Sequence, residues 1–395
     1  MTDHDFYSQF KMDMTQAQEL GFNPYYIEIC SGLDDPIIIN GKEYINLASN
    51  NYLGLATDSR VKQAMHDSID RFGASMCGTP IASGYVELYR TLCEKLSQFS
   101  GLEDTIIFPS GYQANYSLFP VILGKDDLVI VDHYAHASLI QGIKSIGCKI
   151  KPFKHNDLDH LTQVLQRSKD YKKIIVVTES VFSTEGSIAP LDGIVEICSR
   201  YGAVPVVDDS HGIGVLGKTG RGILEEKKLK NFPGIYTASL GKALAGSGGM
   251  IAGKKGFIEF LKYSCSGLIY STALPPAALA GLLKVLEIMK SDHEEILKRM
   301  WDYKHRISDA LEESGFILSN GKAPITSVIG GSLENTVKIA KALFNNGILS
   351  TPFVPPSVPP NGGKVRLIAG ANLKEETVSR IIKIIKNELK KECLD

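Results

Sequence analysis

The 395-residue sequence contains no long hydrophobic run and almost no net charge. No apolar segment approaches the roughly 20 residues that a membrane-spanning helix needs. The first residues, Met1–Asp5, are polar and acidic, whereas a secretion signal has an apolar core. The 43 basic and 44 acidic residues leave a formal net charge of -1, which argues against nucleic acid or an anionic membrane as the main partner. We therefore expect a cytoplasmic protein without a membrane span.

Cysteine is sparse as well. The seven cysteines are scattered, and no CxxC pair or Cys/His cluster has the spacing of a zinc site. This pattern predicts free thiols in a reducing compartment and no bound metal. Hydrophobic residues make up 44% and charged residues 22% of the chain, which is typical of a globular protein. The length favours two domains over one.

The middle of the sequence alternates short apolar runs with amphipathic stretches. The runs are Thr105–Phe108, Leu128–Asp132, Lys149–Phe153, Lys173–Thr178, Val204–Asp208, Ile235–Ser239 and Met250–Ala252. Strands separated by helical patterns such as Leu191–Tyr201 predict a mainly parallel sheet with helices on both faces. We therefore expect an α/β domain over residues 46–275, with its ligand beyond the carboxyl ends of the strands.

The character changes after about residue 275. The pattern predicts a long helix over Pro276–Ser314, a strand at Ile325–Ile329, a helix near Asn335–Asn346 and a basic helix over Lys374–Lys391. Residues 276–395 would form a smaller α+β domain. Residues 1–45 would pack on it or cross between domains, and they include a strand pair around Gly41-Lys42. The proline-rich segment Pro352–Pro360 would be either a loop bordering the site or a rigid surface loop.

Lys242 is the first candidate for chemistry. It lies in the segment Ser239–Leu244, at the end of a predicted buried strand and among small residues. A deprotonated lysine amine can form an imine with an aldehyde, and the Ser239 hydroxyl can donate to a phosphate. Taken alone, such a segment is more often a surface lysine in a glycine-rich turn.

A second strand end favours a catalytic role for Lys242 over a surface position. The segment Val206–Gly214 ends another buried strand, with Asp208 as its last residue and His211 shortly after it. A carboxylate facing a pyridine nitrogen keeps it protonated, so the ring can accept electrons from a carbanion. His211 could donate to a phenolic oxygen of the same ring, although a histidine bonded to backbone is the alternative. With Lys242, these residues indicate pyridoxal 5'-phosphate (PLP).

Two further strand ends carry suitable polar groups. Ser110–Asn115 begins where a strand turns into a helix, so its free amides and the positive end of the helix dipole suit a phosphate. Asp132–Ser138 offers an imidazole that could stack on a planar ring. Spacing alone does not decide between His133 and His136 for this contact.

The ordered set His136, Glu179 to Ser183, Asp208-x-x-His211 and Ser239-x-x-Lys242 resembles the α-oxoamine synthase family of fold-type I PLP enzymes. The resemblance covers nearly the whole chain and includes Leu47–Leu55, Gly214–Gly222 and Val365–Leu367. Members of this family join an amino acid to an acyl-CoA thioester, lose CO2 and release an α-amino ketone.

The resemblance implies roles around the cofactor ring. Lys242 would form the Schiff base and later remove the Cα proton. Asp208 would pair with the pyridine nitrogen, and His211 with Ser183 would contact the phenolic oxygen. His136 would stack on the face of the ring.

The resemblance also implies a homodimer with shared active sites. Gly111, Tyr112 and Ser239 would hold the phosphate, and Thr272 would reach it from a second subunit.

The resemblance further assigns the substrate carboxylate to Asn50 and Arg366; a guanidinium fork suits that planar anion. Arg366 in a surface ion pair is the alternative. Glu179 would either border the acyl-thioester side of the site or serve a structural role.

The segment Gly78–Tyr89 departs from the family pattern. Pro80 stands where members commonly carry arginine, and a tyrosine replaces a histidine. Tyr85 and Tyr89 would shorten or reshape the acyl pocket, or simply repack it.

The leading interpretation is a decarboxylating acyl-CoA:amino acid acyltransferase. The amino acid could be glycine, alanine or serine, and the acyl group short, pimeloyl-like or long. An aminotransferase of the same superfamily is the second interpretation. A catalytically silent partner subunit or a PLP-binding regulator is the third. Lys242 with Asp208 and His211 argues against a silent subunit, and no helix-turn-helix module supports a regulator.

Overall fold

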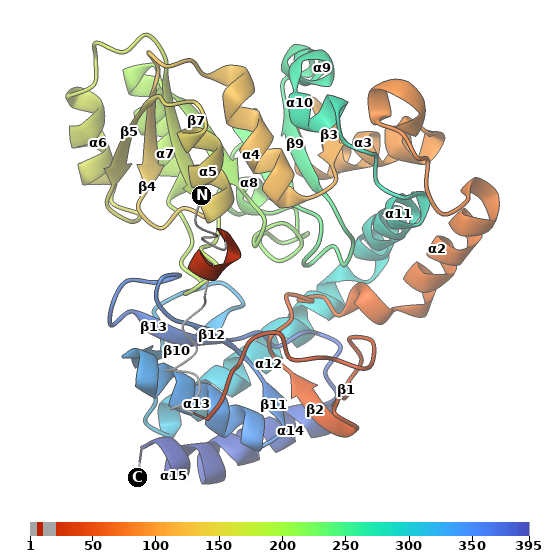
Figure 1. The fold of residues 1–395 in the computed structure, drawn as a ribbon, viewed down its shortest axis with the longest axis vertical. Helices are drawn as coiled ribbons and strands as arrows, with labels where there is room; N and C mark the ends of the chain where they lie inside the picture. Colours follow the sequence, from red (N-terminus) through yellow and green to blue (C-terminus); the bar gives the residue numbers. More distant parts are fainter. Residues whose placement is uncertain (1–5, 11–20, 395) are drawn as a thin grey trace.

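The computed structural model describes residues 6–10 and 21–394. It has a larger region built on one wide sheet and a smaller region built on two short sheets, which lie in the upper and lower halves of Figure 1. Among the residues that the structure describes, no helix combines the length and apolar character needed to cross a membrane.

The wide sheet has seven strands in the order β3-β9-β8-β7-β6-β4-β5. They are β3 (Asp104–Phe108), β4 (Leu128–Asp132), β5 (Lys149–Phe153), β6 (Ile174–Glu179), β7 (Val204–Asp208), β8 (Ile235–Ser239) and β9 (Gly249–Gly253). Only β9 runs against its neighbours. The seven runs read from the sequence are therefore confirmed as strands of one mainly parallel sheet.

Helices cover both faces of this sheet. Alternate residues of β4 divide between the faces: Val129 and Val131 pack in one core cluster, and Leu128 and Ile130 in another. The first cluster lies under α4 (Gly111–Ile122), α5 (Ala137–Lys144), α9 (Lys255–Ser264) and α10 (Ser266–Ile269). The second lies under α6 (Leu158–Gln166) and α7 (Leu191–Tyr201). Burial on both sides explains why β4 is apolar at successive positions.

A third core cluster joins the sheet to helices from distant parts of the chain. These helices are α2 (Ser59–Phe72), α3 (Glu87–Ser100), α8 (Ile223–Glu226) and α11 (Pro276–Ser291). The single helix predicted over Pro276–Ser314 is wrong in one respect. It is two helices, α11 and α12 (His293–Glu313), interrupted at Asp292, whose carboxylate pairs with Arg60 at 2.6 Å.

The smaller region contains two three-stranded sheets. One is antiparallel, with the order β10 (Thr326–Gly331), β13 (Gly363–Leu367) and β12 (Thr351–Phe353). Helices α13 (Leu333–Asn345) and α14 (Glu375–Ile384) pack with it, and the chain ends in η4 (Ile385–Leu389) and α15 (Lys390–Cys393). The boundaries near residues 45 and 275 remain predictions.

The predicted strand pair near the start of the chain forms a hairpin, β1 (Ile37–Ile39) and β2 (Lys42–Asn46). Its turn residues Asn40 and Gly41 both have positive φ, as a tight hairpin requires. β2 then pairs in parallel with β11 (Ile348–Leu349) of the smaller region. The residues that follow the hairpin, from Leu47 to Leu55, thereby enter the space between the two regions.

Candidate active site

The candidate site lies at the carboxyl ends of neighbouring strands. Register pairs Glu179, the last residue of β6, with Asp208, the last residue of β7, and pairs Asp208 with Thr237 of β8. Residues far apart in the sequence therefore meet at one edge of the sheet, as expected for an open parallel sheet.

Asp208 is buried and held by three hydrogen bonds. The backbone amide and the hydroxyl of Ser210 donate to its Oδ1 at 3.0 and 2.5 Å. Nδ2 of Asn115 donates to its Oδ2 at 2.6 Å, and also lies 3.0 Å from Oγ of Ser138. The Thr237 hydroxyl donates to Oδ1 of Asn115 at 2.6 Å. These bonds fix the direction of the carboxylate.

His136 lies at the N-terminus of α5, with its ring exposed to the open site. Its Nδ1 accepts from the Ser138 amide at 3.2 Å and lies 2.7 Å from the Ser138 hydroxyl. Partial burial lowers the pKa of His136, with Lys242 adding to the effect and Asp208 opposing it. Because Nδ1 accepts a hydrogen bond, a neutral His136 imidazole carries its proton on Nε2, which remains available for other contacts.

The other candidate, His133, is exposed, and the centroid of its ring lies 5.9 Å from that of Tyr134.

Glu179 supports the position of His136. Its Oε1 accepts from the backbone amide of His136 at 2.6 Å, and the side chain is buried. Burial, reinforced by the charge of Asp208, raises the pKa of Glu179 well above its ordinary value. Glu179 thus braces the loop from β4 to α5 and also contributes to the electrostatics of the site.

His211 is buried near the start of the loop that follows β7. Its Nδ1 lies 2.8 Å from the hydroxyl of Tyr52, a residue 159 positions earlier in the chain. Burial lowers the pKa of His211 well below its ordinary value, helped by the positive charges of Lys242 and Arg366. Burial also raises the pKa of Tyr52, so the pair is a neutral hydrogen bond that fixes the imidazole.

Lys242 follows β8 in a tight loop and is partly buried. Burial lowers the pKa of its amine, while the charges of Asp208 and Glu179 oppose this effect. The amine therefore lies within electrostatic range of Asp208 and Glu179, the last residues of β7 and β6. A lysine with a lowered pKa retains a larger fraction of its neutral, nucleophilic form.

The first turn of α4 forms a small cradle with Ser239. Ser110 caps the helix by accepting from the Gln113 amide at 3.0 Å. A Cβ added to Gly111 would lie 2.8 Å from Cβ and 3.3 Å from Oγ of Ser239, so only glycine fits there. The amides of Gly111 and Tyr112 belong to the first turn, which has no intrahelical acceptors. This cradle suits a phosphate.

Arg366 of β13 enters the site from the smaller region. It is 6% exposed, and its Nη1 donates to the backbone carbonyl of Ser183 at 3.1 Å. Its guanidinium lies over the ring of Phe353, at the start of the proline-rich segment, 5.1 Å from the centroid. Arg366 Nε and Asn50 Oδ1 are both buried without a hydrogen-bond partner. Arg366 is therefore not a surface ion pair, and its unused donor suits an anionic ligand.

Thr272 lies beside the segment Gly78–Tyr89, which departs from the family pattern. Thr272 is exposed, and its neighbour Ala273 donates from its amide to the Gly78 carbonyl at 3.0 Å. Tyr89 is 1% exposed and its hydroxyl donates to the Ile107 carbonyl at 2.5 Å. Tyr89 is therefore a core residue.

Several residues of the site were not assigned a role from the sequence. The sequence places Asn115 only in a phosphate-binding turn, and Tyr52 only in the family motif Leu47–Leu55. Ser138 and Thr237 complete the hydrogen bonds to Asn115. The available signal was that these polar residues follow or interrupt apolar runs near the carboxyl ends of strands.

The residues present fit PLP. The structure provides an amine with a lowered pKa, a buried carboxylate, a phosphate cradle and unpartnered groups for a substrate carboxylate. The fold and this site define a fold-type I PLP-dependent enzyme.

Comparison with known proteins agrees. The model of the family described as aminotransferase class I and II matches residues 42–385. An 8-amino-7-oxononanoate synthase of Symbiobacterium thermophilum is 37% identical over 86% of this chain and 87% of its own. One from Thermoanaerobacter pseudethanolicus is 36% identical over 86% of each chain. The solved structure of Sphingomonas wittichii serine palmitoyltransferase matches with a TM-score of 0.92 at 26% identity, over 98% of this chain and 99% of that chain.

The chain therefore belongs to the aminotransferase class I and II family, within its α-oxoamine synthase branch. The family name covers acyltransferases as well as aminotransferases. The predicted enzyme class, a PLP-dependent acyltransferase that condenses an amino acid with an acyl group and releases CO2, is confirmed. The interpretations as an aminotransferase or as a silent subunit are therefore set aside.

Proposed function

We propose that the protein condenses L-alanine with an acyl thioester whose chain ends in a carboxylate. The observation that carries the reaction class is the position of Lys242, in the loop after β8 and beside the strand ends that carry Asp208 and Glu179. The substrate choice rests on the relatives at 36–37% identity, which are named for the product 8-amino-7-oxononanoate. Decarboxylative condensation divides that product into an alanine-derived end and a seven-carbon dicarboxylic acyl group.

The geometry of the strand ends supports the roles that the family resemblance implies. Asp208 would hold the ring nitrogen of PLP, His211 with Ser183 the phenolic oxygen, and His136 the face of the ring. When bound, PLP withdraws electrons from the amino-acid carbon that reacts. The three hydrogen bonds to Asp208 prevent it from turning away from that position.

Lys242 would move the proton at the reacting carbon. Its lowered pKa leaves more of the neutral amine, the form that accepts a proton. The hydrogen bond from the His136 backbone amide to Glu179 keeps His136 in position. Burial of these groups excludes water from the reacting atoms.

The substrate carboxylate would bind Arg366 and Asn50. Both have buried polar atoms without a partner, and such atoms are costly to leave unsatisfied. The phosphate would bind Gly111, Tyr112 and Ser239. An anion at each end of the site would hold the amino acid and the cofactor in a fixed relative orientation.

The site would be completed by a second copy of the chain. Thr272 is exposed, and Gln113 of α4 ties its segment to the phosphate cradle through the hydroxyl of Ser271 at 2.5 Å. The large apolar side chains Tyr112, Tyr263 and Tyr270 are exposed around the same segment. We infer a homodimer that buries this face and shares Thr272 between subunits. The cytoplasmic location also remains a proposal, which cell fractionation would test.

Release of labelled CO2 from the carboxyl carbon of the amino acid tests the proposed substrates. L-alanine, glycine and L-serine are each paired with heptanedioyl-CoA and palmitoyl-CoA. We expect fastest release with L-alanine and heptanedioyl-CoA. A preference for L-serine and palmitoyl-CoA would instead favour the activity named for the serine palmitoyltransferase whose structure matches at TM-score 0.92.

A further inference from the structure

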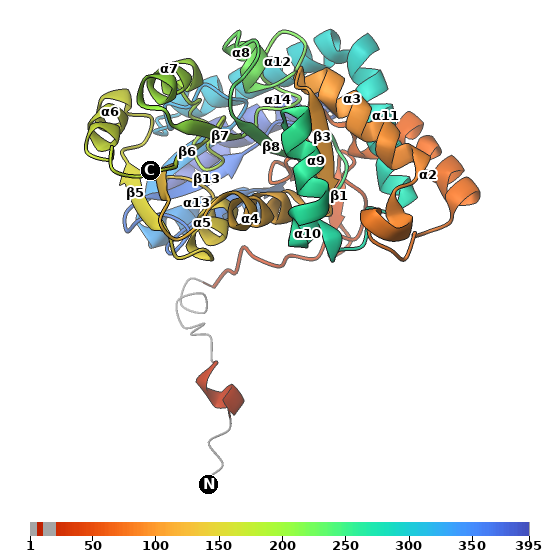
Figure 2. The same ribbon diagram turned by 90° about the horizontal axis from the view of Figure 1, so that it is seen from above.

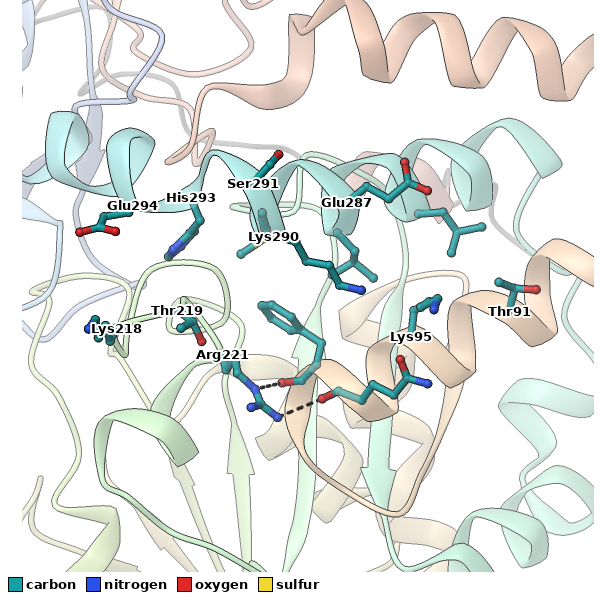
Figure 3. A pocket seen from close by; sticks show the side chains of 15 residues that line it. Thr91, Lys95, Lys218, Thr219, Arg221, Glu287, Lys290, Ser291, His293 and Glu294 are labelled. Atoms are coloured by element: carbon teal, nitrogen blue, oxygen red, sulfur yellow. Dashed lines mark hydrogen bonds between the residues drawn. The ribbon is translucent and has the colours of Figure 1, made fainter.

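A groove of about 790 Å³ lies outside the active site, between α3, α11 and the loop before α8. Figure 3 shows α11 along one wall, α3 along the other and the loop carrying Lys218, Thr219 and Arg221 at one end. A volume of this size is in the range of small-molecule sites. None of the catalytic candidates lines it.

The walls of the groove carry lysines without partners. Lys95 of α3 and Lys290 of α11 extend into the space between the helices in Figure 3, and Lys218 lies at the loop end. Within residues 6–10 and 21–394, none of these three amines forms a hydrogen bond or an ion pair. Glu294 lines the loop end, so the excess positive charge is greatest around Lys95 and Lys290.

Two other charged groups of the groove, Arg221 and Glu287, are already engaged. Arg221 donates from Nε to the Phe99 carbonyl at 2.5 Å and from Nη2 to the Gln98 carbonyl at 2.9 Å. Glu287 is paired with Lys284. The lysines are therefore the groups left to bind an incoming anion.

Apolar side chains line the space between the charged groups. Phe99 of α3 contributes one side, and Leu283, Leu286 and Met289 of α11 contribute the other. Leu283 and Phe99 are partly exposed, so a ligand can contact them without unfolding the core. An aliphatic chain bound here would be stabilised by the apolar surface that it removes from water.

We propose that this groove binds an aliphatic chain that ends in a carboxylate. Lys95 and Lys290 would pair with the carboxylate, and the chain would lie along Leu283, Met289 and Phe99. Neither feature suffices alone, because exposed ion pairs are weak and an uncharged chain leaves the amines without a partner.

The groove is connected to the active site through its floor. His293, at the start of α12, lines the groove and lies 3.1 Å from the Gly214 carbonyl. A Cβ on Gly214 would lie 2.6 Å from Cβ of Ala243, the residue after Lys242. A ligand in the groove would therefore contact a loop that packs directly behind the catalytic lysine.

The groove lies away from the face proposed for dimerisation. In Figure 2, α8 and α12 lie along one edge of the molecule, and α4 and α10 lie along the other. The groove belongs to the first edge, because its loop end precedes α8 and meets the start of α12. It would stay open in the dimer.

Titration calorimetry on the PLP-loaded enzyme tests the proposal without turnover. The probes are octanoate, octan-1-ol, which lacks the charge, and acetate, which lacks the chain. The double variant Lys95→Gln/Lys290→Gln is compared with Lys169→Gln/Lys172→Gln, which removes the same charge from two exposed lysines between α6 and β6. Lys95→Arg/Lys290→Arg retains the charge.

We expect octanoate to bind the wild type, with affinity about tenfold weaker in Lys95→Gln/Lys290→Gln. The control pair and the arginine pair should bind within about twofold of the wild type. Octan-1-ol and acetate should bind much more weakly. The proposal is overturned if octanoate gives no heat, if octan-1-ol binds equally well, or if the glutamine pair at the groove leaves the affinity unchanged.

Discussion

Nδ2 of Asn115 lies 2.6 Å from Oδ2 of Asp208, which connects a helix of one face to the strand end that carries the proposed ring anchor. The same amide nitrogen lies 3.0 Å from the Ser138 hydroxyl, which in turn lies 2.7 Å from Nδ1 of His136. Asn115 thus links the group proposed to lie opposite the ring nitrogen with the group proposed to stack on the ring.

Replacing Asn115 with alanine should disorder this link. Asp208 loses a charge-assisted hydrogen bond, which contributes about 1.5–3 kcal/mol, so we expect kcat to fall about 10- to 100-fold. Steady-state kinetics with cofactor titration would measure the change. Asn387→Ala, on an exposed position of η4, is the control and should be silent. Wild-type kinetics in Asn115→Ala would show that Asp208 needs no such support.

Lys242→Ala should abolish covalent capture of PLP and turnover. The amine that faces Asp208 and Glu179 is removed, and no other lysine is placed at these strand ends by the described contacts. Borohydride reduction followed by peptide mass mapping measures the attachment site. The exposed Lys255→Ala is the matched control and should label like the wild type. Retention of the label in Lys242→Ala would falsify the assignment.

Arg366→Lys should separate binding from chemistry. Lysine keeps the charge but lacks the planar fork, and Nη1 of Arg366 is already used by the Ser183 carbonyl. We expect KM for the amino acid to rise about 10- to 100-fold, with a smaller change in kcat. Arg380→Lys, at an exposed position of α14, serves as the control. An unchanged KM would exclude Arg366 as the carboxylate ligand.

Glu185 joins the two regions in a pH-dependent manner. It pairs with His155 at 3.1 Å and, through its other oxygen, with Lys364 of β13 at 2.8 Å. Burial alone would lower the pKa of His155, but hydrogen bonds to Asp132 and Glu185 raise it to about 9. The bond with His155, together with Lys364, lowers the pKa of Glu185 to about 2 against the effect of burial.

The stabilising effect of this cluster should be greatest in a defined pH window. The contribution of His155 is complete below its unfolded pKa of 6.5 and is lost as the pH rises through about 9. That of Glu185 is complete above its unfolded pKa of 4.5 and is lost as the pH falls through about 2. Glu185→Gln should therefore lower Tm most between these unfolded values, 4.5 and 6.5.

Thermal melts across pH, with the exposed Glu376→Gln as the control, measure this window. A Tm difference for Glu185→Gln that stays constant from pH 6 to pH 10 would contradict the proposed charge pairing.

Mixed dimers test the shared site. The Lys242→Ala homodimer and the Thr272→Glu homodimer are each expected to be inactive. The second is inactive because the glutamate places negative charge where a phosphate would bind. If Thr272 serves the partner's site, a purified heterodimer has one intact site and should regain about half of the wild-type activity. A heterodimer as inactive as its parents would show that the two residues act within one chain.

The sequence alone determined the wide sheet and the strand-end chemistry. Apolar runs of three to six residues between amphipathic stretches predicted the seven strands, because burial on both faces leaves a local pattern. The sequence indicates Lys242, Asp208 and His211 because each lies at the end of such a run or within three residues of it, and strand ends meet at one edge of a parallel sheet.

The tertiary structure alone decided which distant groups meet. Tyr52 bonds His211 across 159 positions, and Asn115 bonds Asp208 across 93. The interruption of the helix pattern at Asp292 and the groove between α3 and α11 also depend on packing between separate segments. Local periodicity records which side of an element is buried, but a contact between two elements depends on how they pack, and that is settled only when the whole core forms.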